Sequence, residues 1–420
     1  MTPSWPPTPA DVARLLEALA LAEERSPHYR ARFAAAGFRV AELRDYDAVR
    51  ARVPRTAKAD LVAAQRNQPP FGDFLAAFPS ELAAVHVSPG PLYIPRLADE
   101  PGGTPVLREA IGAMGVRRGE VAHVTLSYHV MPGGLRLHRA FEEYGCVVLN
   151  GGTGASALQL QVARDLGATV YAGTPSFLGR LADQARELGW DPRRDLHYRL
   201  GFSTAEALPP ALRAELEGAF GLELFDHCGE ALIGPVAGEC HLHAGMHLHA
   251  RDLFCEFLDL ATGDPVEPGG TGELVATHLG RRALPLVRYA PGDVYRLRAG
   301  ECGCGNPAPR VDFVGQVGTI RKVRGVLVHA AQVARVVAEF PELGRFQVVI
   351  EHPAGERYER ATLRAGLVRE APTDLAARLA HRLKETVLLD LGIALVAEGE
   401  IPEDAGPPRY AGAMVDRRTH

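Results

Sequence analysis

Cysteine and histidine residues recur in two short segments at spacings that suit metal binding. Six residues separate Cys240 from His247, and one glycine separates Cys302 from Cys304. Three thiolates and one imidazole form a tetrahedral ligand set that Zn²⁺ prefers. We therefore predict one structural zinc, since four protein ligands leave no open coordination position; free thiols in a β-rich lobe are the alternative. The histidines that compete with His247 as the fourth ligand are His241, His243 and His249.

A second segment with chemical potential covers residues 284–293, LPLVRYAPGD. Its apolar, β-branched run is typical of a strand that carries Arg288 and breaks at Pro291 and Gly292, and Asp293 follows. A carboxylate just past a strand end accepts hydrogen bonds from ribose hydroxyls in other nucleotide folds. We predict that Asp293 binds ribose and that Arg288 fixes the strand end near a phosphate. The alternative is a strand followed by a turn and a solvated aspartate.

The composition describes an ordinary globular protein. The chain has 420 residues, of which 46% are hydrophobic and 23% charged, so one large domain and a smaller one are expected. The net charge of -5 without a basic block excludes a nucleic-acid partner as the default. No signal-peptide pattern or bilayer-length apolar run is present, which predicts a cytoplasmic protein without a membrane partner. Only three of the 46 basic residues are lysines, so a role that needs lysine has few candidates.

Alternating patterns predict the elements that position these residues. Apolar spacing over residues 10–40 indicates helices. Strands at 121–126, 146–149, 169–172 and 198–202 alternate with helices at 134–144, 157–166 and 175–188, which predicts parallel βαβ units with ligand sites at the strand C-termini. Residues 250–300 are β-rich. After residue 320, strands at 346–350, 361–367 and 393–396 with a helix at 373–388 predict a small α+β domain.

Several motifs in this order resemble those of the phenylacetate–coenzyme A ligase branch of the adenylate-forming enzymes, and the match runs nearly end to end. The segment 284–293 resembles P-L-x-R-Y-x-x-G-D. Residues 55–61 resemble T-x-K-x-D-L, residues 173–178 the T-P-S-Y-L helix start, Ala205-Glu206 the A-E-P turn that flanks adenine, and residues 315–325 the hinge G-R-x-D-D-x-x-x-x-R-G.

This resemblance implies an α/β fold with a large N-terminal adenylate-forming domain over 1–315, which contains parallel βαβ units and a β-rich lobe. It further implies a hinge over 316–325 and a mobile α+β domain over 326–420. The implied activity is ATP-dependent activation of a carboxylic acid, aryl by the character of its pocket, through an acyl-AMP, with transfer to coenzyme A. The implied cofactors are ATP or AMP, Mg²⁺ and coenzyme A, and a homodimer is possible by analogy.

The resemblance also assigns site residues. Catalytic roles fall to Lys322, Arg409 and Glu230. Nucleotide-binding roles fall to Ser88, Gly90, Ala205, Glu206, Asp226, His227, Arg288, Asp293 and Arg310. The wall that binds the acid is expected at Tyr128, His129, Gly133, Gly134, Thr174, Pro175 and Phe177, where aromatic and small residues suit a flat aryl acid.

Three departures from the family pattern bear on activity. The phosphate loop H-x-S-S-G-T-T-G-K-P reads HVSPGPLYIP here, so Pro89 and Pro91 remove two N–H donors and Ile94 replaces the lysine. The C-terminal lysine position is occupied by Tyr410, and the hinge aspartate by Gly318 or the next residue. Two alternatives therefore remain: a degenerate homologue that binds a nucleotide or acyl-adenylate without adenylating, and an acyltransferase that uses a preformed adenylate.

Overall fold

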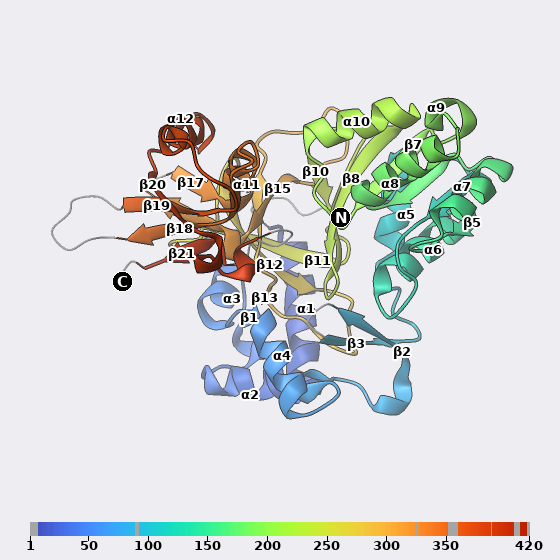
Figure 1. Cartoon of the computed structure of the whole chain (residues 1–420). Helices are drawn as coiled ribbons and strands as arrows, with labels where there is room; N and C mark the ends of the chain where they lie inside the picture. Colours follow the sequence, from blue (N-terminus) through green and yellow to red (C-terminus); the bar gives the residue numbers. More distant parts are fainter. Residues whose placement is uncertain are drawn as a thin grey trace. The chain divides into compact units, whose positions relative to one another are not determined.

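The computed structural model describes residues 7–88, 92–323, 326–351, 360–387, 389–406 and 412–417. Its helices are α1 (Pro9–Arg25), α2 (Pro27–Ala35), α3 (Tyr46–Arg52), α4 (Lys58–Asn67), α5 (Thr104–Ala113), α6 (Pro132–Tyr144), α7 (Ser156–Asp165), α8 (Pro175–Glu187), α9 (Pro192–Asp195), α10 (Pro210–Phe220), α11 (Ala330–Val337) and α12 (Leu375–Val387) (Figure 1). None of the described helices is long and apolar enough to cross a membrane.

The strands form one large sheet and three smaller ones. They are β1 (Thr56–Ala57), β2 (Leu82–Ser88), β3 (Leu92–Leu97), β4 (Val121–Val124), β5 (Val147–Asn150), β6 (Val170–Gly173), β7 (Leu200–Thr204), β8 (Glu223–Glu230), β9 (Gly234–Glu239), β10 (Met246–Leu248), β11 (Leu253–Leu258), β12 (Thr271–His278), β13 (Tyr289–Ala290), β14 (Asp293–Leu297), β15 (Arg310–Gln316), β16 (Ile320–Val323), β17 (Val326–His329), β18 (Leu343–Glu351), β19 (Arg360–Leu367), β20 (Gly392–Ala397) and β21 (Met414–Asp416).

The large sheet confirms the predicted fold class. Its order is β1-β13-β12-β14-β15-β10-β9-β8-β7-β6-β4-β5, with β11 paired to β12. Strands β4 to β8 are all parallel, and β8, β9, β10 and β15 continue as antiparallel neighbours. The parallel half is the predicted series of βαβ units, so the loops after β4, β6, β7 and β8 leave from the same edge.

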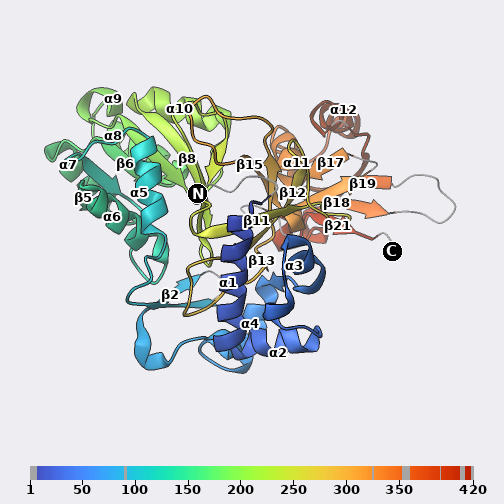
Figure 2. The same cartoon turned by 180° about the vertical axis from the view of Figure 1, so that it is seen from behind.

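Helices cover both faces of this parallel half. One core packs α5 and α6 through Leu107 and Phe141 against Ala172 of β6, and the other packs α8 and α10 against Tyr171 of the same strand. Successive residues of a strand point to opposite faces, which explains why neighbours in β6 belong to different cores. Helix α5 is in front of the sheet in Figure 2, whereas α8 and α10 are in front in Figure 1.

Local sequence sets the ends of these helices. Thr174 caps α8 by accepting a hydrogen bond from the Phe177 N–H (3.2 Å), and Pro175 occupies the first helical position. Helix α6 begins at Pro132 and ends at Gly145, whose φ of 104° is the left-handed conformation that glycine adopts readily. The predicted helices at 134–144 and 175–188 are therefore confirmed to within two residues.

The strand predicted before the break at Pro291 is much shorter than expected. Only Tyr289–Ala290 pairs, as β13, although Leu284, Leu286 and Val287 are buried. Pro285 has no N–H for a strand ladder, and Arg288 adopts a left-handed φ of 43°. The apolar run is buried because it fills the core and not because it belongs to the sheet.

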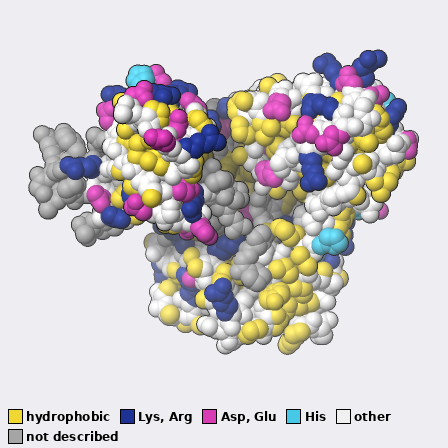
Figure 3. Space-filling model, in the orientation of Figure 1, with side chains coloured by type: hydrophobic (Ala, Val, Ile, Leu, Met, Phe, Trp, Pro, Cys, Tyr) yellow, Lys and Arg dark blue, Asp and Glu magenta, His cyan; other side chains and the backbone are white. Residues whose placement is uncertain are grey.

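The chain divides into two compact units. The first comprises Met1–Pro291 and Arg296–Asp312, and the second Gly292–Tyr295 and Phe313–His420. The second unit holds the four-stranded sheet β20-β19-β18-β21, packed against α11 and α12 through residues such as Val333 and Leu379. A hinge over 316–325 stays a prediction. Over the face displayed in Figure 3, basic and acidic side chains are interspersed, in keeping with the modest net charge.

Candidate metal centre and nucleotide site

Four of the predicted metal ligands converge in the first unit. The ligand atoms of Cys240, His247, Cys302 and Cys304 all lie within 4.8 Å of one another. The sulfurs of Cys240 and Cys302 are 3.8 Å apart, and the Cys304 sulfur lies 3.3 Å from His247 Nε2. Cys240 directly follows β9 and His247 lies in β10, and antiparallel pairing of these strands brings them together. We call these four residues the cysteine–histidine cluster.

The surroundings of His247 suit a metal ligand. Its Nδ1 is 3.1 Å from the carbonyl of Ala308, so Nδ1 carries the hydrogen and Nε2 faces Cys304 with a lone pair. Arg310 holds the cysteine loop in place, since its guanidinium donates to the carbonyls of Ala244 (2.7 Å) and Gly300 (3.0 Å). Desolvation raises the pKa of the Cys240 thiol to about 11. The donor set, its burial and the hydrogen bond from His247 Nδ1 to the Ala308 carbonyl fit zinc.

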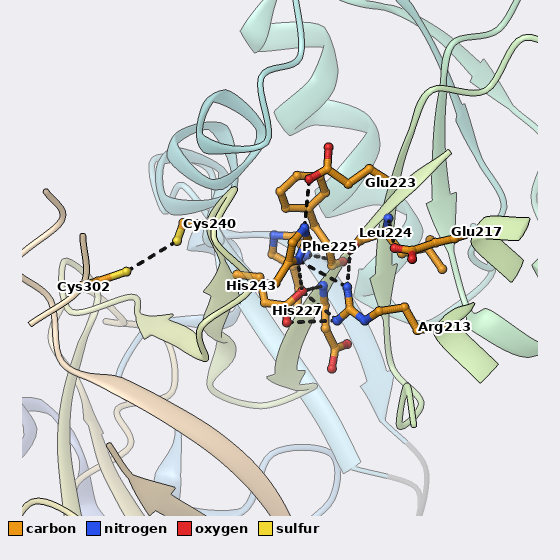
Figure 4. Close-up of polar contacts among 11 residues, drawn as sticks. Arg213, Glu217, Glu223, Leu224, Phe225, His227, Cys240, His243 and Cys302 are labelled. Carbon is orange, nitrogen blue, oxygen red and sulfur yellow. Dashed lines mark hydrogen bonds and ion pairs between the residues drawn. The ribbon is translucent and has the colours of Figure 1, made fainter. Parts of the chain in front are cut away.

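The three alternative histidines do not join the cluster. His243 lies 3.0 Å from Glu239 and 2.9 Å from Glu223, and it belongs to a network with Arg213. Arg213 Nη2 contacts both oxygens of Glu239, at 2.9 and 2.8 Å. Figure 4 shows this network to one side of Cys240 and Cys302. His241 is exposed, and His249 lies outside the cluster. The fold therefore brings His247, and not its competitors, to the cysteines.

Most residues predicted to bind the acid follow the C-terminal ends of β4 and β6, which are parallel neighbours. Thr174, Pro175 and Phe177 form the start of α8. Tyr128 lies 3.2 Å from His138 through its hydroxyl, and His129 is exposed. A Cβ on Gly134 would lie 2.4 Å from the Ser127 carbonyl oxygen, so only glycine fits there, while Gly133 has more room. This arrangement permits the predicted acid site, which stays a prediction.

The turn after β7 is tied to the start of α8. Glu206 accepts hydrogen bonds from the Ser176 N–H (3.1 Å) and hydroxyl (2.8 Å). Ala205, beside it, adopts a left-handed φ of 68°. Such backbone strain in a residue other than glycine persists where the surrounding structure enforces it, as at ligand sites. Ser88, at the end of β2, has a buried hydroxyl without a hydrogen-bond partner among the described residues.

Strand β8 carries two predicted nucleotide contacts and one catalytic candidate. Desolvation, followed by the charge of Glu239, raises the pKa of Asp226 to about 7. His227 is buried and stacks on Phe202 at 3.6 Å, and burial lowers its pKa to about 3. Glu230 accepts hydrogen bonds from two backbone N–H groups of the following turn and lies 3.6 Å from the Lys58 ammonium. The pairing of Glu230 with Lys58 was not foreseen from the sequence.

Arg288 and Arg310 are engaged within the protein. Arg288 forms a buried ion pair with Glu256 through two nitrogens, at 2.9 and 3.0 Å, and donates to the Val53 carbonyl at 2.6 Å. Arg310 is occupied by the backbone carbonyls that surround the cysteine loop. These bonds would have to break before either guanidinium contacted a nucleotide, so that role stays a prediction.

The remaining predicted site residues are Asp293, Gly90, Arg409 and Lys322. Asp293 begins β14 and is 8% exposed, and its Oδ1 accepts a hydrogen bond from Gln316 at 3.1 Å. Ribose binding by Asp293 stays a prediction. Gly90 and Arg409 lie outside the described residues, and the structure describes the backbone of Lys322 in β16 but not its side chain.

Sequence reasoning missed a group of arginines. Arg96, Arg136, Arg139 and Arg281 line one pocket with His86 and His278. The one local signal was the spacing of Arg136 and Arg139, three positions apart and therefore neighbours on α6. The other two come from distant segments, and only the fold joins them.

Comparison with known proteins defines the class and then the family. A 2-hydroxyisobutyryl-CoA ligase, in an open conformation with 2-HIB-AMP and CoA, matches with a TM-score of 0.82 and 24% identity, covering 97% of this chain and 91% of that one. ATP-bound MatB from Rhodopseudomonas palustris gives a TM-score of 0.53 at 14% identity, covering 82% of this chain and 69% of that one. The fold is thus that of the adenylate-forming CoA ligases.

Curated relatives narrow the class. A phenylacetate–coenzyme A ligase of Pseudomonas putida is 33% identical over 339 residues, which are 79% of this chain and 75% of that protein. A phenylacetate–coenzyme A ligase of Thermus thermophilus is 29% identical, in an alignment that covers 94% of this chain and 93% of that protein. No family model matches the chain. The protein belongs to the phenylacetate–coenzyme A ligase family, which confirms the resemblance in its motifs.

Proposed function

We propose that this chain activates a carboxylic acid with ATP and transfers the acyl group to coenzyme A. In the first step a carboxylate oxygen attacks the α-phosphorus of ATP and pyrophosphate leaves. In the second step the thiolate of coenzyme A attacks the acyl carbon and AMP leaves. The observation that carries this proposal is the match to phenylacetate–coenzyme A ligases over most of their length.

We infer an aryl acid as the substrate. Tyr128 and Phe177 follow adjacent parallel strands, and the aromatic rings with Gly133 and Gly134 suit a flat ring. Glu230 is the candidate carboxylate for Mg²⁺, which would supply charge neutralisation at the phosphates when bound. Lys322 and Arg409 are the candidate cations for the two half-reactions, and Asp293 is the candidate ribose contact.

A specific observation favours a second candidate function, in which the chain binds a nucleotide or acyl-adenylate without adenylating. Ile94, at the position of the family's phosphate-loop lysine, is 2% exposed and pairs with His86 in the β2–β3 hairpin. A buried isoleucine offers a phosphate neither charge nor a side-chain donor. An acyltransferase that accepts a preformed adenylate would also retain activity under this constraint.

ATP–pyrophosphate exchange across a panel of aryl and fatty acids separates these functions. The ligase proposal expects exchange with aryl acids and thioester formation when coenzyme A is added. Absence of exchange for every acid, with thioester formed from a synthetic acyl-AMP, would establish the acyltransferase instead. Absence of both reactions, with AMP still bound, would establish the degenerate homologue.

Calorimetry tests the nucleotide contacts directly. Each lost donor to a charged group costs roughly 1.5–3 kcal/mol, so the altered loop is expected to weaken ATP at least tenfold relative to an acyl-AMP mimic. Asp293→Ala should weaken AMP by a comparable factor, whereas the surface change Asp183→Ala should not. Tight ATP binding that ignores Asp293→Ala would contradict both the loop argument and the ribose assignment.

We also propose that the cysteine–histidine cluster holds a structural zinc. The ion would join the segment after β9, β10 and the loop between β14 and β15. The donor set and the orientation of His247 support this proposal.

A further inference from the structure

A cavity in the first unit is lined by an excess of positive charge. It has a volume of about 120 Å³ and lies beside the β2–β3 hairpin, the first half of α6 and the segment that follows β12. Arg96, Arg136, Arg139 and Arg281 line it. We call this cavity the arginine pocket. None of the predicted acid, nucleotide or metal residues lines it, but His86, Ile94 and Pro95 of the segment that resembles the phosphate loop do.

The carboxylates beside the pocket do not balance these arginines. Both oxygens of Glu100 are engaged by backbone N–H groups, Oε1 by those of Arg282 and Ala283 and Oε2 by that of Leu97. Asp252 is half-buried at the pocket and forms no ion pair with the pocket arginines among the described residues. Among the described residues, neither Arg136 nor Arg281 forms an ion pair. The four arginines that line the pocket outnumber its two lining carboxylates, Glu100 and Asp252, by two charges.

Two guanidinium donors in the pocket have no partner. Arg281 Nη1 and Arg96 Nε are buried and form no hydrogen bond within the described part of the chain. A buried donor on a charged group without an acceptor costs free energy, and arginine cannot escape this cost by losing its proton. Such an arrangement is typical of a site that a ligand completes.

Two histidines, His86 and His278, line the same pocket. Desolvation, followed by the neighbouring arginines, lowers the pKa of both His86 and His278, so neither adds a charge near neutral pH. His278 Nδ1 accepts a hydrogen bond from the Gly280 N–H at 3.2 Å. Its Nε2 therefore carries the hydrogen and can donate to an acceptor.

We propose that the arginine pocket binds one phosphate group, either as free phosphate or as the terminal group of a phosphorylated ligand. A cavity of about 120 Å³ has room for one tetrahedral phosphate group. Arginines from three segments surround the space, and guanidinium forks match phosphate oxygens. A dianion neutralises the excess charge. This site lies beside the hairpin that has lost its phosphate-loop lysine, but it requires no adenylation activity.

Calorimetry with inorganic phosphate at constant ionic strength tests the proposal. Saturable binding is expected for the native chain, and at least tenfold weaker binding for Arg136→Gln and Arg281→Gln. Arg186→Gln is the matched control, because it removes the same charge from the exposed face of α8. Arg139→Gln, an exposed change at the pocket rim, keeps the test valid should the other variants fail to fold. Absence of phosphate binding by the native chain would overturn the proposal. Phosphate binding by Arg139→Gln and Arg281→Gln as tight as that of the native chain would overturn it too.

A second readout separates a ligand site from a structural cluster. In phosphate-free chloride buffer, Arg281→Met removes an unpaired charge, so its melting temperature should equal or exceed that of the native chain. Added phosphate should raise the melting temperature of the native chain and of Arg186→Gln, but not of Arg281→Met. A structural arginine would lower the melting temperature in the absence of phosphate, and that result would contradict the proposal.

Competition identifies the source of the phosphate group. Displacement of phosphate by coenzyme A but not by dephospho-coenzyme A would assign the pocket to the 3′-phosphate, and displacement by ATP or pyrophosphate would assign it to the nucleotide tail. If none of these displaces it, the ligand is free phosphate. Acetate at equal concentration should not compete, and equal competition by acetate would refute selectivity for phosphate.

Discussion

The cysteine–histidine cluster and the arginine pocket each bring several groups of the same kind together in the first unit. They differ in whether a change of protonation can remove the repulsion between those groups. Thiols and an imidazole meet in the first, and burial raises the pKa of the Cys240 thiol. Permanent cations meet in the second, where Arg281 Nη1 has no acceptor among the described residues. Protonation can relieve the first cluster, but no titration relieves the second near neutral pH. An arginine cluster is therefore the stronger indication that a ligand belongs there.

The largest expected effect concerns the metal side of the comparison. Protein purified without chelator should contain about one zinc per chain, and Cys302→Ser should release it and lower the free energy of unfolding by several kcal/mol, because structural zinc binding is coupled to folding. Elemental analysis and urea unfolding provide the measurements. Cys146→Ser, a buried cysteine outside the cluster, is the control. Metal-free protein that is fully folded would end the zinc proposal.

The next effect is the loss in the free energy of unfolding when a buried arginine loses its carboxylate partner. Arg288 lies seven positions after Arg281, yet its guanidinium is fully engaged with Glu256 and backbone carbonyls. Glu256→Gln should lower the free energy of unfolding by about 3–5 kcal/mol, because it leaves a buried charge unpaired. Glu109→Gln, at an exposed pair, should have little effect in the same urea titration. Similarly small losses in the free energy of unfolding for both variants would show that burial of Arg288 does not increase the effect of removing its partner.

A smaller effect depends on pH and concerns the network beside the metal ligands. The hydrogen bond to Glu239, aided by Glu223, raises the pKa of His243 above its ordinary value of 6.5. Its contribution is therefore fully present below pH 6.5 and is lost as pH rises through the raised pKa. His243→Gln should cost up to about 1 kcal/mol at pH 6 and less at pH 9, since the group is partly exposed. A loss of stability in His243→Gln that grows with pH would contradict the direction of this pKa shift. His241→Gln serves as the control.

The smallest expected effect sets the baseline for these charges. Arg108 and Glu143 form a 3.3 Å ion pair between α5 and α6, and both side chains are 44% exposed. Arg108→Gln should change the free energy of unfolding by less than about 1 kcal/mol, and added salt should reduce the change further. A loss as large as that of Glu256→Gln would remove burial as the explanation for the differences between these arginines.

Sequence patterns predicted much of the fold because those patterns are local. The helices at 175–188 and 373–388 and the strands of the βαβ series carry their periodicity and end signals within the segments themselves. The strand before the break at Pro291 was predicted too long because buried irregular chain and buried strand show the same apolar run. The β2–β3 hairpin and α5 were not anticipated.

In the candidate sites, too, local sequence predicted some residues and long-range packing selected others. Cys302-Gly-Cys304 is a compact signal, and together with Cys240 and a nearby histidine it led to the prediction of a metal site. The choice of His247 over His241, His243 and His249 depended on the pairing of β10 with β9 and β15, which brings His247 opposite Gly238 and Arg310. Four histidines at nearly equal sequence distance differ only in what the sheet places beside them.

By itself the sequence determined the family, the parallel βα series and the choice of cysteines in the cysteine–histidine cluster, because each depends on residues close together or in a recurrent order. Only the tertiary structure decided that Arg96, Arg136 and Arg281 share a cavity while Arg288 and Arg310 are satisfied. The physical reason is that every arginine carries the same charge in the sequence. Long-range packing determines which of them meets a carboxylate, which meets a carbonyl, and which is left facing another arginine.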